Sequence, residues 1–249
     1  MISVTILTKN SARYLEEVLA ALRPFEEVLI YDNGSTDATL SIAEHYPNVT
    51  IKKGSFTGFG PTHNIASQLA KNDWILSIDS DEVVTPEMAE EVLKVSLDPT
   101  CVYSFPRNNY YNGKWIRWCG WYPDRQIRLY NRTKTKFTDA QVHESIIADK
   151  MQVIPLQSPL RHYSYNNHAE FLSKMQSYSD LFAKQYKGKR RSSPCKAVLH
   201  GLAAFMKAYV LKRGLMGGYE GFVISVYNGN TAFYKYLKLY EANQENQHG

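Results

Sequence analysis

The sequence predicts an α/β fold, a mostly parallel sheet followed by a helical C-terminal extension. In residues 1–80 short apolar runs alternate with amphipathic stretches, and strands separated by single helices form right-handed βαβ units with parallel strands. From residue 167 onward the apolar residues recur at helical spacing. The segment between these two patterns is rich in aromatic residues and short strand-like runs, which indicates a mixed extension of the sheet.

Four strands are expected in residues 1–80, each a short run rich in β-branched or aromatic residues. They are Val4–Leu7, Val28–Tyr31, Val49–Ile51 and Trp74–Ile78. Asn10 or Ser11 can cap the helix after the first strand, and Ser35 or Thr36 can cap the helix after the second. A glycine-bearing loop at residues 54–61 leads into a third helix, and a fourth helix follows Pro86.

In the later chain the elements are shorter at first and then helical. The expected strands are Tyr103–Phe105, Lys114–Trp118, Gln126–Tyr130 and Gln152–Ile154, and the expected helices lie near 167–187, 195–212 and 217–240. The 249 residues fit one large domain or one domain with an appendage.

The composition argues against several classes of protein. The three cysteines are widely spaced and form no CxxC pair, which argues against disulfides and structural zinc. No apolar run approaches the roughly 20 residues that a membrane-spanning helix needs. The chain opens on a strand-like run, without the basic region, apolar region and cleavage site of a signal peptide. We therefore expect a cytoplasmic protein.

The strongest chemical signal is the acidic pair of Asp79-Ser80-Asp81, which directly follows a buried strand. Two carboxylates at this spacing can both reach a hard divalent cation, and such a cation keeps waters and bridges diphosphate oxygens. An Asp-x-Asp also arises by chance in solvated loops, but its position after two βα units favours a metal site. An EF-hand is excluded, because Val83 and Val84 stand where that loop needs an oxygen ligand and a glycine.

Polar residues follow two other strands of the predicted sheet. Thr8-Lys9-Asn10 comes after the first strand, and Asp32 ends the second. Ligands of parallel sheets bind outside the carboxyl ends of the strands, so these groups together predict a nucleotide site. Asp32 can accept a hydrogen bond from a nucleobase N–H. The alternative is that it only shapes the turn and caps the next helix.

Taken in order, these motifs resemble those of family 2 inverting glycosyltransferases, which have the GT-A fold. The segments that carry the resemblance are Thr8-Lys9-Asn10, Asp32 to Asp37, Gly58-Phe59-Gly60 with Asn64, and Ile78 to Glu82. Later segments are similar to the bacterial lipopolysaccharide inner-core β-1,4-glucosyltransferases: Gly120 to Arg125, Arg128-Leu129-Tyr130, Val142-His143-Glu144 and Arg161-His162-Tyr163. The resemblance covers nearly the whole chain.

This resemblance implies a Rossmann-like, mixed-sheet GT-A domain at residues 1–165, with a nucleotide-sugar half at 1–98 and an acceptor half at 99–165. Residues 166–249 would form the helical extension. The implied reaction moves a hexose, glucose in that subfamily, from a UDP-sugar to a core heptose. Mg²⁺ or Mn²⁺ would assist, held at Asp79 and Asp81.

The resemblance also implies a set of ligand-binding residues. Those expected to bind the nucleotide sugar are Thr8, Lys9, Asn10, Asp32, Asn64, Asp79, Ser80, Asp81 and Arg128. Asp32 would contact uracil. The family often has Lys or Arg directly before the position of Asn64, whereas this chain has His63, which puts a phosphate contact there in question at neutral pH. His143 could complete the metal shell or donate to the diphosphate, or it could be structural.

Inverting transfer needs a general base that deprotonates the acceptor hydroxyl. Glu144 is the first candidate, since it follows a strand-like segment, and Asp124 is the second. A surface salt bridge is the alternative role for Glu144. Arg125 and Arg128 could neutralise phosphates on an acidic acceptor, although strand-end arginines often pair with carboxylates of the protein itself.

The C-terminal third is strongly basic. Between residues 181 and 240 the only acidic residue is Glu220, and the basic residues are Lys184, Lys187, Lys189, Arg190, Arg191, Lys196, Lys207, Lys212, Arg213, Lys235 and Lys238. Apolar stripes between them could be ordinary core contacts. The excess of basic residues suits an amphipathic surface on anionic lipid. We therefore expect a peripheral protein on the inner face of the cell membrane, acting on a lipid-linked glycan acceptor.

Other functions remain open from the sequence. The fold could serve a non-catalytic protein that holds nucleotide or glycan at a membrane, or a family 2 transferase for another polysaccharide. Nucleic-acid binding is not expected, because the tail has no RRM or KH signature and its charges alternate with apolar stripes. A nucleotidyltransferase would need a glycine-rich, lysine-bearing loop after the first strand, which this chain lacks.

Overall fold

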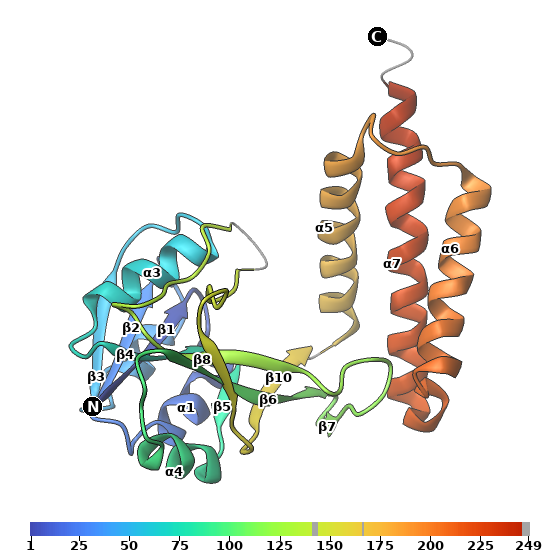
Figure 1. The fold of residues 1–249 in the computed structure, drawn as a ribbon. Helices are drawn as coiled ribbons and strands as arrows, with labels where there is room; N and C mark the ends of the chain where they lie inside the picture. The colour runs from blue at the N-terminus through green and yellow to red at the C-terminus, as the bar shows by residue number, and fades with distance from the viewer. Residues whose placement is uncertain (141–143, 166, 246–249) are drawn as a thin grey trace. The chain divides into compact units, whose positions relative to one another are not determined.

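The computed structural model describes residues 1–140, 144–165 and 167–245. It divides into two compact units, and each forms around its own packed elements (Figure 1). The first unit comprises Met1–Asn108 with Asp124–His162, and the second comprises Asn109–Pro123 with Tyr163–Gly249. The sequence analysis assigned residues 109–123 to the domain at 1–165, whereas in the structure they cluster with the C-terminal helices.

The first unit is built on four parallel strands in the order β3-β2-β1-β4. These are β1 (Ile2–Thr8), β2 (Glu27–Asp32), β3 (Val49–Lys53) and β4 (Trp74–Asp79). All six residues of β2 are buried, as expected for a central parallel strand covered on both faces. The four strands predicted from the sequence are confirmed, each extended by one to three residues.

Helices connect these strands (Figure 1). They are α1 (Ala12–Ala21), α2 (Thr39–Ala43) and α3 (Phe59–Leu69), and a further helix, α4 (Pro86–Lys94), follows the last of the four strands. The predicted cap of the second helix is wrong: α2 begins at Thr39 and not after Ser35 or Thr36. The reason is that Asp37 accepts a hydrogen bond from Thr39 N at 3.0 Å, which ends the loop there. The third helix also begins earlier than expected, at Phe59 within the glycine-bearing loop.

The predicted mixed extension of the sheet is confirmed. Its strands are β5 (Glu82–Val84), β6 (Cys101–Tyr111), β7 (Lys114–Trp115), β8 (Arg125–Asn131), β9 (Gln152–Pro155) and β10 (Leu160–Tyr165). Strand β8 pairs antiparallel with both β4 and β6. The short antiparallel pair of β5 and β10 was not predicted, because β5 has only three residues. It follows directly on residues 79–81, which we call the acidic turn.

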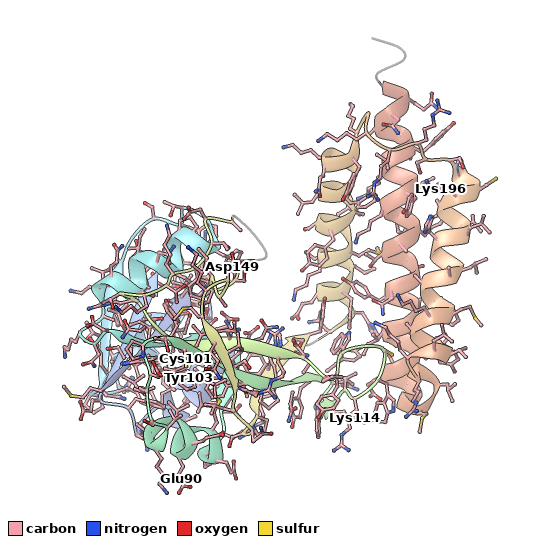
Figure 2. All side chains as sticks on the ribbon, in the orientation of Figure 1. Glu90, Cys101, Tyr103, Lys114, Asp149 and Lys196 are labelled. Atoms are coloured by element: carbon pink, nitrogen blue, oxygen red, sulfur yellow. The ribbon has the colours of Figure 1, made fainter. Side chains whose placement is uncertain are left out.

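One part of the core of the first unit lies between the sheet and α3. Leu29, Ile75, Val102, Tyr130 and Phe137 form one buried cluster there. Figure 2 places Cys101 and Tyr103 in the interior of this unit, and both are almost fully buried, whereas Glu90 points to solvent from α4. Buried packing therefore holds the parallel strands in place along their length, and polar residues stand at their carboxyl ends.

The second unit is a helical bundle. Its helices are α5 (His168–Tyr186), α6 (Pro194–Met206) and α7 (Gly218–Glu245), and α7 packs against both of the others. Between α6 and α7 lie a π-helical turn, η1 (Lys207–Leu211), and a 3₁₀ turn, η2 (Gly214–Gly217). The helices expected near 167–187, 195–212 and 217–240 are confirmed. In the described part of the chain, no helix has the length and hydropathy that crossing a membrane requires.

Glycines let α6 and α7 approach closely. A Cβ atom on Gly201 would lie 3.0 Å from Phe233 Cβ, and one on Gly229 would lie 3.1 Å from Phe205 Cβ. Residues 109–123 join this unit through Cys119, whose sulfur lies 3.5 Å from Ser225 Oγ on α7. Close contacts therefore join α6, α7 and residues 109–123, although the unit exposes many large apolar side chains.

Candidate functional site

The acidic turn lies where the carboxyl ends of three parallel strands meet. Asp79 ends β4 and pairs in register with Leu7 of β1, while Thr8 pairs with Asp32 of β2. The side chains of Asp79 and Asp81 are 36% and 42% exposed. Asp81 Oδ2 lies 3.6 Å from His162 Nε2 on β10. The predicted gathering of polar groups at this sheet edge is therefore present.

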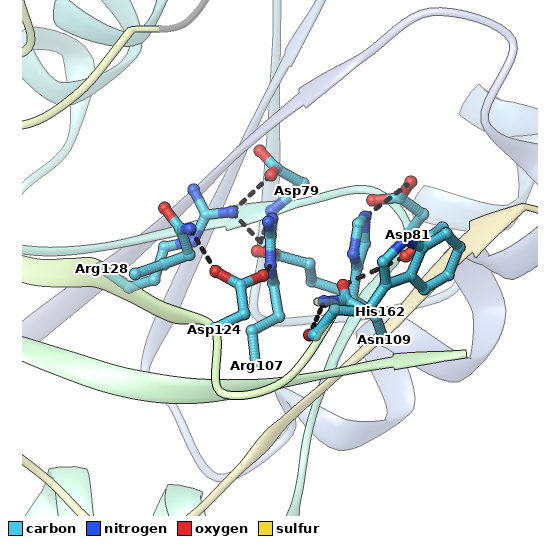
Figure 3. A network of polar contacts seen from close by, with 11 residues as sticks. Asp79, Asp81, Arg107, Asn109, Asp124, Arg128 and His162 are labelled. Carbon is cyan, nitrogen blue, oxygen red and sulfur yellow. Dashed lines mark hydrogen bonds and ion pairs between the residues drawn. The ribbon is translucent and has the colours of Figure 1, made fainter. Parts of the chain in front are cut away.

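A buried network of charges stands behind the acidic turn (Figure 3). Arg128 of β8, only 8% exposed, forms ion pairs with Asp79 and with Glu82, which is fully buried. Arg107 of β6 lies 3.3 Å from Glu82 and 2.8 Å from Asp124. We call Asp79, Glu82, Arg107, Asp124 and Arg128 the charge network. It links the acidic turn to Asp124 through fixed side chains.

The charge network alters the proton affinities of its members. Burial alone would raise the pKa of Asp79, but the Arg128 guanidinium, with smaller contributions from His63 and His162, holds it at about 2. Burial raises the pKa of Glu82, and the charge of Asp79 adds to this, although Arg128 opposes it. Asp79 is thus ionised at any physiological pH, and Arg128 is the group that keeps it so.

One cavity of about 530 Å³ opens beside this network. Asp79, Arg107 and Arg128 line it together with Arg125 and Glu144. Asp124 itself does not line the cavity, and its two oxygens accept hydrogen bonds from Arg107 Nε and Gln126 Nε2, both at 2.8 Å. The cavity therefore combines three cations with two acids.

A second cavity, of about 410 Å³, lies at the ends of β1 and β2. Its polar lining comes from Thr8, Lys9, Asn33 and Ser80, and the rings of Phe56 and Phe59 form its apolar side. Ser80 lines this cavity and its neighbour Asp79 lines the other. The acidic turn therefore borders both cavities.

Asp32 and Asn10 lie beside this second cavity and shape its loops. Asp32, 1% exposed, accepts hydrogen bonds from Thr8 Oγ1, Gly34 N and Ser35 N, each at 3.0 Å. Burial opposes the charge of Asp32, but these bonds, above all those from Ser35, lower its pKa. The side-chain oxygen of Asn10 accepts from Thr36 N at 2.8 Å. The contact of Asp32 with uracil stays a prediction.

Two further predicted positions lie on α3. The amide of Asn64 both donates to and accepts from the backbone of Phe137, at 3.0 and 2.9 Å, so it cross-links α3 to the loop after β8. His63 is buried and stacks on the Phe137 ring at 4.5 Å. Burial lowers its pKa to about 4, with Asp79 opposing and Arg128 adding to the shift, so His63 is neutral and offers no cation to a phosphate. His143 lies outside the described residues.

The sequence analysis missed Arg107 and the role of Glu82. Glu82 was part of the recognised motif, but only the fold shows that it faces inward between two arginines. Arg107 had no signal in the sequence, because its partners are far away along the chain.

The donor atoms at the acidic turn suit a hard divalent cation. Asp79 and Asp81 offer carboxylate oxygens, and the described residues contain no cluster of three or more potential metal ligands. A cation with only two protein ligands must take its other oxygens from water and from a ligand, as Mg²⁺ commonly does with phosphates. The residues present therefore fit a metal that is shared with a diphosphate.

Comparison with known proteins identifies the family of this chain. The profile of glycosyl transferase family 2 matches residues 3–151, more than half of the chain. A glycosyltransferase of Rickettsia bellii that is described as uncharacterized is 28% identical, over 96% of this chain and 86% of that protein. The lipopolysaccharide core biosynthesis glycosyltransferase LpsC of Rhizobium meliloti is 25% identical, over 96% of this chain and 92% of LpsC.

Among solved structures, S. aureus TarS in complex with UDP-GlcNAc is similar, with a TM-score of 0.47 and 13% identity over 100% of this chain and 92% of that one. A TM-score at this level adds nothing to the assignment. The family match and the full-length relatives decide it: the chain is a glycosyltransferase and belongs to glycosyl transferase family 2.

Proposed function

We propose that this enzyme moves a hexose, glucose, from a UDP-sugar to a heptose of a lipopolysaccharide core at the inner face of the cell membrane. The observation that carries the proposal is that the acidic turn borders two cavities, since Ser80 lines one and Asp79 the other. A nucleoside in the cavity that Ser80 lines and a sugar in the cavity that Asp79 lines would place the diphosphate between them, at the turn.

The cavity at the ends of β1 and β2 is suited to the nucleoside. Phe56 and Phe59 offer ring faces to a base, and Asn33 and Thr8 offer hydrogen-bonding groups. Lys9 supplies a cation at the same cavity. Asp32 would then orient the loop through its hydrogen bonds to Thr8, Gly34 and Ser35. It would contact the base only through a carboxylate lone pair that these bonds do not use. The cavity chemistry supports a nucleotide carrier, and uracil is the proposed base.

Asp79 and Asp81 would hold the divalent cation, with His143 as a further proposed ligand. Such a cation, Mg²⁺ or Mn²⁺, supplies positive charge to a departing diphosphate. Arg128 has a different role in this proposal. Its ion pair with Asp79 keeps that carboxylate ionised and holds it in position. Asn64 and Asn10 are proposed to act on the donor by fixing the loops around it.

Glu144 is the proposed general base. It lines the same cavity as Asp79, which is where an acceptor hydroxyl would meet the sugar. Asp124 is the competing candidate, but its two oxygens already accept hydrogen bonds from Arg107 and Gln126. Arg107 and Arg125 are positioned to face an anionic acceptor in this cavity.

The proposed acceptor and location are supported by two observations. The relative LpsC acts in lipopolysaccharide core biosynthesis, according to its name, and matches this chain over nearly its full length. The helical unit is basic and exposes large apolar side chains, among them Leu199, Leu202 and Leu211 at 60% or more. A surface of this kind suits the interface of an anionic leaflet.

A donor screen tests the proposal directly. The protein is incubated with UDP-glucose, UDP-galactose, UDP-GlcNAc and GDP-mannose, with and without Mn²⁺, and its melting temperature and sugar hydrolysis are measured. UDP-glucose with metal should give the largest stabilisation and turnover. Asp81→Asn should lose turnover by more than about 100-fold. Full turnover of Asp81→Asn in excess chelator would remove the metal from the proposal, and a preference for another acceptor in a parallel screen would replace the heptose.

A further inference from the structure

A third cavity, lined by cations, lies wholly within the helical unit. Its volume is about 580 Å³, and its walls are residues 117–123 and residues 211–216. Arg117, Lys212 and Arg213 line it, and no acidic side chain of the described chain does so. Glu220, the one acid among residues 181–240, is buried and paired with Lys114 at 2.9 Å. The cavity therefore carries an uncompensated positive charge.

The cavity walls are locked together by backbone contacts. Cys119 N donates to Lys212 O at 2.9 Å. A Cβ atom on Gly120 would lie 2.2 Å from Lys212 Nζ, so glycine leaves the room that the lysine side chain occupies. Arg213 adopts a left-handed φ of 57°, which is uncommon for a residue with a side chain. These contacts hold two adjacent cations at one wall of the cavity.

Aromatic and apolar side chains complete the cavity. Trp118 and Tyr122 belong to its lining, and the Arg117 guanidinium lies 3.9 Å from the centre of the Trp115 ring. Leu211 and Met216 also line it, although they are 77% and 60% exposed. Cations beside exposed leucine and methionine match the boundary between lipid headgroups and acyl chains, where charge and apolar surface change within a few ångströms.

We propose that this cavity binds the phosphate of an anionic phospholipid headgroup, with Arg117, Lys212 and Arg213 as its cations. The proposal rests on the membrane association proposed above and names the group that is recognised there. Arginine suits phosphate because its planar guanidinium donates two parallel hydrogen bonds. An acidic peptide or a free phosphate would neutralise the same cations but would leave Leu211 and Met216 in water, so the lipid fits the lining better.

Vesicle binding of the full-length protein tests the site. The double variant K212Q/R213Q is compared with R190Q/R191Q, which removes the same charge from the α5–α6 loop at the other end of α6. Each cation near an anionic leaflet contributes about 1 kcal/mol, so K212Q/R213Q should bind vesicles of phosphatidylcholine with phosphatidylglycerol about 30-fold more weakly. The matched control should change less than about 3-fold, because charges beyond a Debye length of about 8 Å are screened. Melting temperatures confirm that both variants are folded.

Four other outcomes would contradict the proposed phospholipid site. Equal weakening by the two pairs would mean that diffuse charge binds the membrane without a built site. Equal binding of native protein to vesicles of phosphatidylcholine alone would mean that no anion is recognised. Release from the vesicles by millimolar inorganic phosphate, with unchanged sulfate controls, would mean that the cavity takes free phosphate. Absence of any vesicle binding would remove both the site and the membrane association, whereas turnover on a soluble acceptor would leave the proposed transfer reaction standing.

Discussion

The two units of this chain differ in which unfavourable groups they contain: the first unit buries charged side chains, and the helical unit exposes apolar ones. The first unit hides charge: Glu82 is fully buried and Arg128 is 8% exposed. The helical unit exposes apolar surface: Leu199 and Leu211 are 67% and 77% exposed. A buried charge costs free energy unless it is paired, and a large exposed apolar patch marks a binding surface. The first unit therefore keeps its costly groups in the interior, where ion pairs stabilise them, whereas the helical unit exposes them to solvent.

Substitution of the proposed base should give the largest difference between an effect on catalysis and an effect on vesicle binding. Glu144→Gln keeps the shape of the side chain but cannot take a proton, so kcat should fall by about 10²–10⁴-fold, while vesicle binding should not change. Asp124→Asn is the matched comparison, and steady-state kinetics with a soluble acceptor measure both. A larger loss for Asp124→Asn than for Glu144→Gln would assign the base to Asp124.

Removal of the central arginine should produce the next largest effect. Arg128→Met leaves Glu82 and Asp79 without their shared partner, so the free energy of unfolding should fall by about 3–5 kcal/mol. Lys94→Met is the control, because Lys94 pairs with Glu90 at a surface position where both side chains are more than 60% exposed, and it should cost less than about 1 kcal/mol. Urea denaturation measures both. Equal costs would show that burial of the charge network does not matter.

Much of the first unit followed from the sequence alone. The four parallel strands are short apolar runs of the kind typical of buried strands. Polar residues such as Thr8 and Asp79 stand where these runs and the strands end. Those two signals are local, so they located the sheet edge correctly. The same reasoning failed at α2, because the hydrogen bond that Thr39 N donates to Asp37 sets the helix start and competes with two other possible caps.

The rest of the site depends on contacts between distant segments. Arg107 reaches Glu82 across 25 residues of sequence, and Arg128 reaches Asp79 across 49. No local pattern distinguishes Arg107 from Arg132, which binds Asp73 at the surface, and only the family resemblance singled out Arg128. The side chain of Asn64 likewise bonds to Phe137 through tertiary structure alone. Burial and pairing therefore became visible only in the folded chain.

A buried histidine should make the first unit acid-sensitive. Burial lowers the pKa of His63 from 6.5 to about 4, so between these two values the unfolded chain binds a proton that the folded chain does not. Stability should therefore fall as the pH falls from 6.5 to 4, by about 3 kcal/mol in total, and the loss should be complete below pH 4.

His63→Phe tests this assignment. The variant removes the titrating group but keeps a ring that can stack on Phe137. The free energy of unfolding is measured for both proteins at several pH values between 7 and 4, and the native protein should show the steeper dependence. Parallel curves for the two proteins would mean that another group carries the acid sensitivity.

The smallest expected effect on stability comes from the exposed apolar surface. Leu199 and Leu202 are 67% and 60% exposed on α6, so Leu199→Gln with Leu202→Gln should change the free energy of unfolding by less than about 0.5 kcal/mol per site. Ile224→Ala, at a fully buried position of α7, should instead cost about 2–5 kcal/mol. If the two leucine substitutions also cost several kcal/mol, and do so in a concentration-dependent way, this face is buried against a second copy of the chain. Unchanged stability together with weaker vesicle binding would show that the surface serves attachment.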